Sequence, residues 1–331
     1  MCLVFCWLAV SGRRSFSLSR KGWGARARCN DDSRLLGNLW QKHRCGLGHR
    51  RAADRLADMI RGFGRPQDFF DQFGGQDEFG SYRIIGRYHV SIFDDHDMVG
   101  RRDGKRRFLA GNNSENRFAQ IAHAVGVQMT TLGIPCIYYG TEQAFDGSVD
   151  QHDREIDPSG PDGIPYGDRY LRECMFGGTF GAFQTEGCRF FDREHPTYLR
   201  VAALARVRNR RDMIGQALRC GRQYLRKVSA DGGHAFDTPL PGELASWSRI
   251  LHNQDVIITL NTHGSKNRCA RVLLDSRFHP EGPSMRFLHR GDWEDEELKN
   301  PPSDQTVPLE YVEEAATVRI NLSPAGMMIL A

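Results

Sequence analysis

The segment from Val90 to Asp97 most constrains what this chain can fold into. It reads Val-Ser-Ile-Phe-Asp-Asp-His-Asp, an apolar run that ends in three carboxylates and an imidazole. A helical pattern at 115–132 and a second apolar run at 133–140 follow it. A strand, a crossover helix and another strand form a βαβ unit, and reactive groups in such units gather where the strands end. We therefore expect the chemistry of this chain at Asp94, Asp95, His96 and Asp97.

Charge divides the chain into two parts. The 331 residues carry a formal net charge of +4, yet residues 1–50 hold 10 Lys and Arg against 2 Asp and Glu. The remaining residues are therefore mildly acidic, which argues against a nucleic-acid surface on the folded part. We expect three regions: a disordered or non-native basic leader at 1–52, an α/β region at 53–235 and an all-β region at 236–331.

The leader carries no clear helical or strand period. Its apolar stretch, residues 2–10, is too short to span a membrane, and no basic residue precedes it as in a signal peptide. A nucleic-acid or targeting arm is one interpretation, and a disordered or wrongly translated leader is the one we favour. The nine cysteines include no Cys-x-x-Cys, which favours unpaired thiols and a cytoplasmic location.

Apolar spacing predicts the main helices and strands. Residues 52–61, 67–73, 115–132 and 195–211 have helical spacing, with Asn113 or Ser114 expected to cap the third helix and Pro196 in the first turn of the fourth. From residue 236 the chain turns to short runs separated by turn residues, which predicts an antiparallel β-sandwich or small barrel. Trp247 and Trp293 could stack on sugars as exposed rings, although a core position is expected for Trp247. The acidic run 291–297 is expected to be a solvated loop.

Two motifs in this order resemble the alpha-amylase family, glycoside hydrolase family 13. Residues 93–97 with Arg101 are similar to the end of that family's seventh barrel strand, and residues 133–142 (Gly-Ile-Pro-Cys-Ile-Tyr-Tyr-Gly-Thr-Glu) to its eighth. The resemblance implies α/β plus all-β architecture over roughly 53–331. It implies the C-terminal portion of a (β/α)8 TIM barrel followed by an antiparallel β-sandwich.

The resemblance also implies roles for single residues. Asp97 would stabilise the transition state, His96 and Arg101 would bind the sugar, and structural support would come from Asp94, Asp95, Tyr139 and Glu142. The implied activity is retaining hydrolysis or transfer at α-glucosidic bonds, with an α-glucan or maltooligosaccharide as substrate, and without a nucleic-acid or membrane partner. Calcium occurs in the family, but no residue here is assigned to it, and no cofactor is expected.

Two expected motifs are not found in the chain. The family nucleophile motif resembles Gly-Phe-Arg-x-Asp-x-x-Lys-His, and the third-strand motif resembles Asp-x-x-x-x-Asn-His; neither occurs. Because glycoside cleavage needs a nucleophile and an acid/base carboxylate, we expect this chain to be inactive alone and to be a truncated or frame-shifted product. The alternatives are a non-catalytic glycan-binding or interaction module, and a metal site built from His89, Asp94, Asp95, His96 and Asp97.

Overall fold

The computed structural model describes residues 50–73, 86, 89–95, 107–146, 175, 178–180, 185–187, 191–230, 233–279 and 284–331. Helices are α2 (Arg50–Ile60), α3 (Pro66–Asp71), α5 (Arg117–Thr130), α7 (Pro196–Arg208), α8 (Met213–Cys220), α9 (Asp295–Lys299) and the 3-10 turn η1 (Thr141–Gln143). Short strands are β1 (Val90–Ser91), β2 (Ile134–Pro135), β3 (Gly178–Phe180) and β4 (Thr185–Gly187). Longer strands are β5 (Arg222–Arg226), β6 (Val228–Ala230), β7 (Leu244–Leu251), β8 (Gln254–Asn261), β9 (Arg268–Leu273), β10 (Ser284–Arg290), β11 (Thr306–Val312), β12 (Ala315–Leu322) and β13 (Met327–Leu330).

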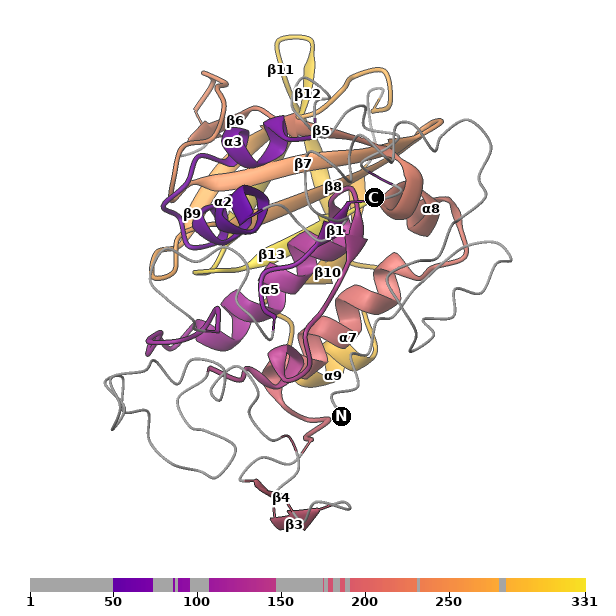
Figure 1. Ribbon diagram of the computed structural model, residues 1–331. Coiled ribbons are helices and arrows are strands. Elements are labelled where there is room, and N and C mark those ends of the chain that lie inside the picture. Colours follow the sequence, from indigo (N-terminus) through magenta and orange to yellow (C-terminus); the bar gives the residue numbers. More distant parts are fainter. Residues whose placement is uncertain are drawn as a thin grey trace, which may run out of the picture.

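An antiparallel sheet dominates the C-terminal part of the molecule (Figure 1). Within the described residues it has nine strands in the order β5-β7-β8-β13-β10-β11-β12-β9-β6. Both β6 and β9 contact β7, so the sheet is nearly closed on itself and its two halves face each other. Between the halves lies one apolar core, which includes Ile257, Val272, Val318, Met328 and Leu330.

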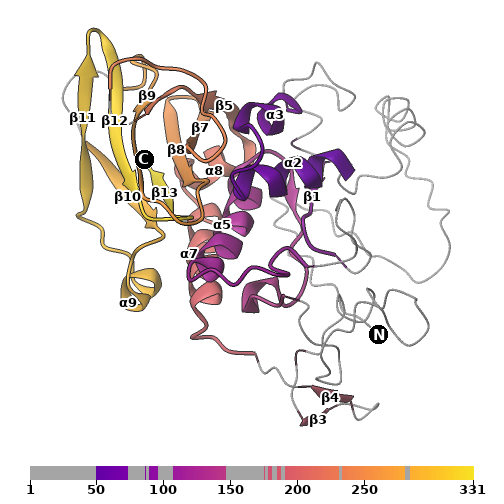
Figure 2. The ribbon, with the colours of Figure 1, turned by 90° about the vertical axis from the view of Figure 1, so that its left-hand side faces the viewer.

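Helices cover the other face of the half made by β7, β8 and β13. Figure 2 shows this as layers, with β11 and β12 on one side, β7, β8 and β13 in the middle, and α5, α7 and α2 on the other. The middle strands are therefore buried on both faces, which explains the unbroken apolar run from Val256 to Ile258. Gly126 of α5 allows close packing, because a Cβ there would lie 2.5 Å from the Met327 sulfur.

The predicted helices are present with bounds close to those expected. In α7, Pro196 occupies the first turn and the ring of His195 accepts a hydrogen bond from the Thr197 N–H at 3.2 Å, which caps the helix. The predicted cap of α5 was wrong. Asn116 stands at that position, and its side-chain amide donates instead to the Gly264 carbonyl at 3.1 Å.

Two arginines are buried at the ends of helices. Arg249 donates to the carbonyls of Thr130 at 2.9 Å and Gly221 at 3.1 Å, and Arg208 donates to the Met129 carbonyl. These carbonyls belong to helix C-termini, whose unpaired oxygens and partial negative charge compensate a buried cation. Burial, with the neighbouring Arg208 charge, lowers the pKa of Arg249 to about 9, so the guanidinium still carries its charge at neutral pH.

The described chain is thus a mixed α/β fold with a large antiparallel sheet, as the sequence predicts at this coarse level. The sheet also includes β5 and β6, which precede residue 236, while the domain boundary itself stays a prediction. The acidic run is not a loop throughout: Glu294 and Glu297 form a capping box that starts α9. No helix in the described ranges has the length and apolar character needed to cross a bilayer.

Candidate functional site

The two short strands β1 and β2 form a parallel pair. The Ile134 N–H donates to the His89 carbonyl at 2.7 Å, and the Cys136 N–H donates to the Ser91 carbonyl at 2.9 Å. Gln128 of α5 fastens the pair by donating to the Ser91 carbonyl at 2.7 Å. Because parallel strands end at the same edge, the residues that follow Ser91 and Pro135 leave the pair on the same side.

Asp94 connects the two strand ends. Its Oδ1 accepts a hydrogen bond from the Phe108 N–H at 2.6 Å, and its Oδ2 accepts one from the Thr141 hydroxyl at 3.3 Å. The carboxylate is buried, so these hydrogen bonds replace the water that an exposed carboxylate would bind. Asp94 therefore ties the end of β1 to the loop before α5 and to η1.

Replacing Asp94 by Ala is expected to lower the free energy of unfolding by about 2 kcal/mol, because a buried N–H and a buried hydroxyl lose their acceptor. Asp94→Asn keeps one acceptor oxygen and should cost about half as much. Urea unfolding of the full chain, followed by far-UV circular dichroism, measures both values. An Asp94→Ala variant as stable as the parent chain would refute this linking role.

Arg107 is fully buried and directly precedes Phe108, whose N–H binds Asp94. It donates to the Tyr139 carbonyl at 2.9 Å, and its guanidinium carbon lies 4.7 Å from the centre of the Tyr138 ring. The rings of Tyr139 and Phe145 lie at 5.4 Å. Three aromatic faces around one guanidinium stabilise its charge and fix the loop after β2. Sequence reasoning missed Arg107, because it stands in a basic, loop-like stretch where no periodicity distinguishes it.

The turn after β2 has little freedom. Gly140 has a positive φ of 81°, and a Cβ there would collide with the Phe145 ring, so only glycine fits. Gln143 exchanges two hydrogen bonds of 2.9 Å with the backbone of Asp192, which holds η1 against the segment before α7. Glu142 lies between Gly140 and Gln143. Burial raises the pKa of its carboxyl group, while backbone N–H groups and the Arg107 charge oppose the rise.

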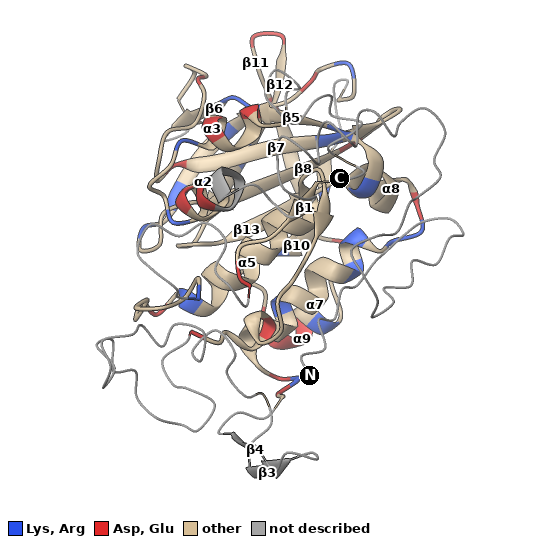
Figure 3. Cartoon of the chain, in the orientation of Figure 1, with Lys and Arg blue, Asp and Glu red and all other residues tan. Residues whose placement is uncertain are grey.

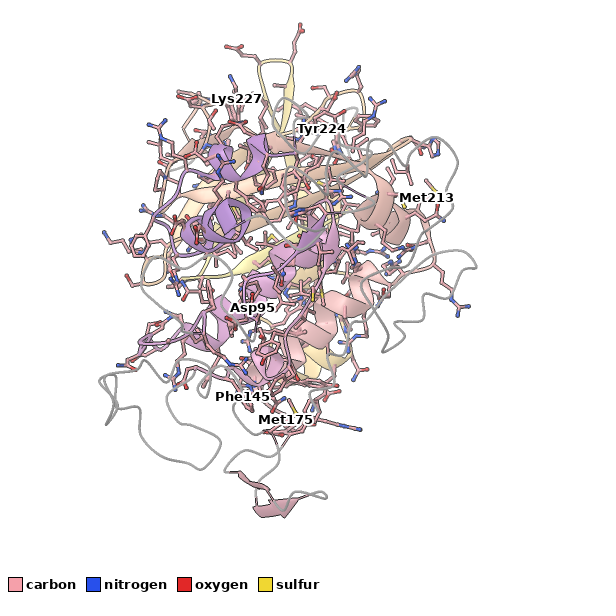
Figure 4. The ribbon with its side chains drawn as sticks, viewed as in Figure 1. Asp95, Phe145, Met175, Met213, Tyr224 and Lys227 are labelled. Atoms are coloured by element: carbon pink, nitrogen blue, oxygen red, sulfur yellow. The ribbon has the colours of Figure 1, made fainter. Side chains whose placement is uncertain are left out.

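Four of the predicted site residues lie in the described part of the chain. Asp94 and Asp95 are buried at the end of β1, and Tyr139 and Glu142 are partly buried in the segment after β2. Figure 4 shows Asp95 in the helix-bearing part of the molecule, apart from Tyr224 and Lys227 of the sheet. The other three, His96, Asp97 and Arg101, lie outside the described residues.

The metal alternative receives no support from the part of the chain that the structure describes. Within those ranges, no three His, Cys, Asp or Glu side chains gather closely enough to hold a metal ion, so His89, Asp94 and Asp95 do not form such a group. Burial lowers the pKa of His89 to about 4. No residue of the described chain is therefore assigned to calcium or to another metal.

The mixed α/β region with a polar edge at the ends of parallel strands, backed by an antiparallel sheet, resembles enzymes of the alpha-amylase and cyclomaltodextrin glucanotransferase family in its fold. The solved structure of gamma-cyclomaltodextrin glucanotransferase from alkalophilic Bacillus clarkii matches 89% of this chain with a TM-score of 0.53 and 16% identity. That of the cyclomaltodextrin glucanotransferase CldA, with a three-domain ABC distribution, matches 84% with a TM-score of 0.51 and 18% identity.

Sequence comparison agrees over a shorter stretch. The cyclomaltodextrin glucanotransferase of Niallia circulans is 37% identical over 70 residues, which are 21% of this chain and 8% of that protein. No family model matches the sequence. This chain spans 33% of the length of the Bacillus clarkii enzyme and 42% of the length of CldA. The resemblance to the alpha-amylase family that the two motifs indicated is therefore confirmed as a resemblance in fold over most of the chain.

Proposed function

We propose that this chain binds α-glucans at the edge formed by the ends of β1 and β2. The hydrogen-bonded link from Asp94 to Thr141 carries the proposal, because it brings the end of the first motif next to the second. In this proposal, residues 96, 97 and 101 lie at this edge. In the proposed complex Asp97 accepts hydrogen bonds from two sugar hydroxyls, and His96 and Arg101 bind the same glucose unit. In this proposal, residues 53–235 correspond to the C-terminal portion of a (β/α)8 barrel, and residues 236–331 correspond to the β-sandwich that follows it.

The chemistry suits a glucan. A carboxylate that accepts from two neighbouring hydroxyls forms charge-assisted hydrogen bonds, which are stronger than bonds between neutral groups. In a glycosidase of this type such bonds strengthen as the ring gains oxocarbenium character, which lowers the barrier to cleavage. Asp97 would therefore contribute to binding in any case, and to catalysis only beside a nucleophile and an acid/base carboxylate.

We propose further that the chain alone binds without cleaving. The supporting observation is in the sequence: the Asp-His-Asp motif is present at 95–97, whereas the expected nucleophile motif does not occur in the 331 residues. Retaining hydrolysis or transfer at α-glucosidic bonds is the activity of the resembled family, and it needs both carboxylates.

Maltoheptaose titrated into the full chain in a calorimeter tests the binding. We expect saturable binding that Asp97→Asn weakens by about tenfold or more, the value of a lost charge-assisted hydrogen bond. Asp304→Asn, which alters an exposed carboxylate before β11, is the matched control and should leave the affinity unchanged. An affinity that does not depend on Asp97, or no binding at all, would refute the proposed site.

Turnover is measured separately, by the release of reducing ends from the same oligosaccharide. The expected rate for the chain alone equals that of buffer. A rate above buffer that Asp97→Asn abolishes would overturn the binding-only proposal and establish a glycosidase.

A further inference from the structure

Two buried imidazoles lie between the helix layer and the sheet. His123 of α5 and His289 of β10 both have 0% exposure, and their ring centres are 5.9 Å apart at an interplanar angle of 78°. The indole of Trp293 lies 6.3 Å from the His289 ring. The pair therefore fills part of the joint where α5 packs on the sheet.

The hydrogen bonds of this pair are incomplete. The His123 Nδ1 lies 2.5 Å from the Ala325 carbonyl oxygen, so Nδ1 carries the proton and donates it. Among the described residues, neither the His123 Nε2 nor either ring nitrogen of His289 has a hydrogen-bond partner. Gly291 packs directly against the open side of the first ring, since a Cβ there would lie 2.6 Å from the His123 Nε2.

The charged groups around the pair disfavour a proton on it. From α7, Arg200 and Arg206 bring positive charge, and the Arg200 Nε donates to the Gly291 carbonyl at 3.1 Å. Asp292 is the acidic group that favours a proton on His123, but it is already paired with Arg290 at 2.6 Å. The charges of Glu294 and Asp295, at the start of α9, raise the pKa of Arg200 and so favour its positive charge. Figure 3 shows the basic α7 and the acidic α9 in this region.

Burial is the largest cause of the lowered pKa of both imidazoles. It lowers the pKa of His123 to about 4, with the Arg200 charge acting in the same direction and the Ala325 carbonyl and Asp292 opposing it. Burial, then the neighbouring His123, Arg200 and Arg206, lowers the pKa of His289 well below its ordinary value.

We propose that His123 and His289 form an acid-sensitive joint, at which protonation separates α5 from β10 and β13 and so loosens the helix layer from the sheet. In the open joint each imidazole is hydrated and binds a proton with its ordinary pKa of about 6.5. In the closed joint the imidazoles stay neutral in this pH range. The closed form is therefore favoured equally at every pH above about 6.5. As the pH falls from 6.5 toward 4, each imidazole raises the opening constant by about tenfold per pH unit.

Amide hydrogen exchange of the full chain at pH 6 and pH 5 tests the joint, with rates corrected for the intrinsic effect of pH. Peptides that cover 117–130 and 284–293 should show an opening constant that rises by about 60-fold between pH 6 and pH 5. Peptides from the β9–β12 ladder, at 268–273 and 315–322, contain no histidine and serve as the internal reference. Equal pH dependence in both sets of peptides would overturn the proposal.

Variants assign the effect to the two rings. His289→Phe keeps a planar ring that cannot take a proton and should reduce the rise to about tenfold per pH unit. If the His289→Phe variant does not fold, His289→Gln is used in its place. The double variant with His123→Gln should remove the excess over the reference, and His234→Gln, at an exposed position, should retain it. A double variant with the parent chain's pH dependence would refute the joint. So would imidazole signals of His123 and His289 that titrate near pH 6.5 in NMR spectra.

Discussion

Replacing Trp247 by Ala is expected to lower the free energy of unfolding by about 4 kcal/mol, as for other large aromatic residues removed from a core. Trp247 has no exposed surface, and its ring lies 5.5 Å from that of Phe70 in α3. It stands on the face of β7 that the helices cover, so its removal leaves a cavity between sheet and helices. Guanidinium unfolding of the full chain, with circular dichroism as the signal, measures the loss.

Trp247→Phe is the matched control for this prediction. The indole Nε1 has no hydrogen-bond partner among the described residues, so Phe loses volume but no polar contact and should cost about 1 kcal/mol. The alternative interpretation of Trp247 and Trp293, exposed rings that stack on sugar, is wrong, because these side chains are only 0% and 4% exposed. A Trp247→Ala variant as stable as the parent chain would refute the core role of this ring.

Replacing Asp255 by Ala is expected to cost about 3 kcal/mol, the lower end of the range for breaking a buried ion pair. The Asp255 Oδ2 lies 3.3 Å from an Arg226 guanidinium nitrogen and 3.2 Å from the His279 Nε2. The Asp255 side chain is 0% exposed, whereas that of Arg226 keeps 15% exposure and can regain some water. The loss arises mainly because Arg226 is left without its buried carboxylate, and the same unfolding experiment measures it.

A double variant distinguishes the cost of an unpaired buried charge from the cost of lost packing. Combining Asp255→Leu with Arg226→Met removes both charges and should be more stable than Asp255→Ala, because no uncompensated charge remains. A loss below about 0.5 kcal/mol for Asp255→Ala, the size typical of surface changes, would show that the pair contributes little. A double variant less stable than the single one would show that the cost comes from packing instead.

Periodicity predicted the long elements well and the short ones poorly. α5 and α7 carry apolar residues at helical spacing along their whole length, and β7, β8 and β12 are unbroken or alternating apolar runs. β5 was missed, since its sequence Arg-Gln-Tyr-Leu-Arg is mostly polar and it lies at an end of the sheet. α8 is a short helix, with too few residues for a period to stand out.

For the candidate site, the sequence indicated the residue types but not their supports. The chain order of the two motifs predicted that Asp94 and the segment after Pro135 would meet, and the strand pair and the Asp94–Thr141 hydrogen bond bring them together. Arg107 could not be found in this way, because it is buried by Tyr138, Tyr139 and Phe145, which lie beyond α5 and β2 in the chain.

The sequence by itself determined where the main helices and strands run and which known family the two motifs resemble, since periodicity and motif spacing are local properties of a chain. Only the tertiary structure decided that helix ends compensate Arg208 and Arg249, and that the imidazoles of His123 and His289 are sealed between the layers. The physical reason is that burial and charge compensation depend on groups brought together from distant segments. The same side chain in water would be hydrated and would titrate normally.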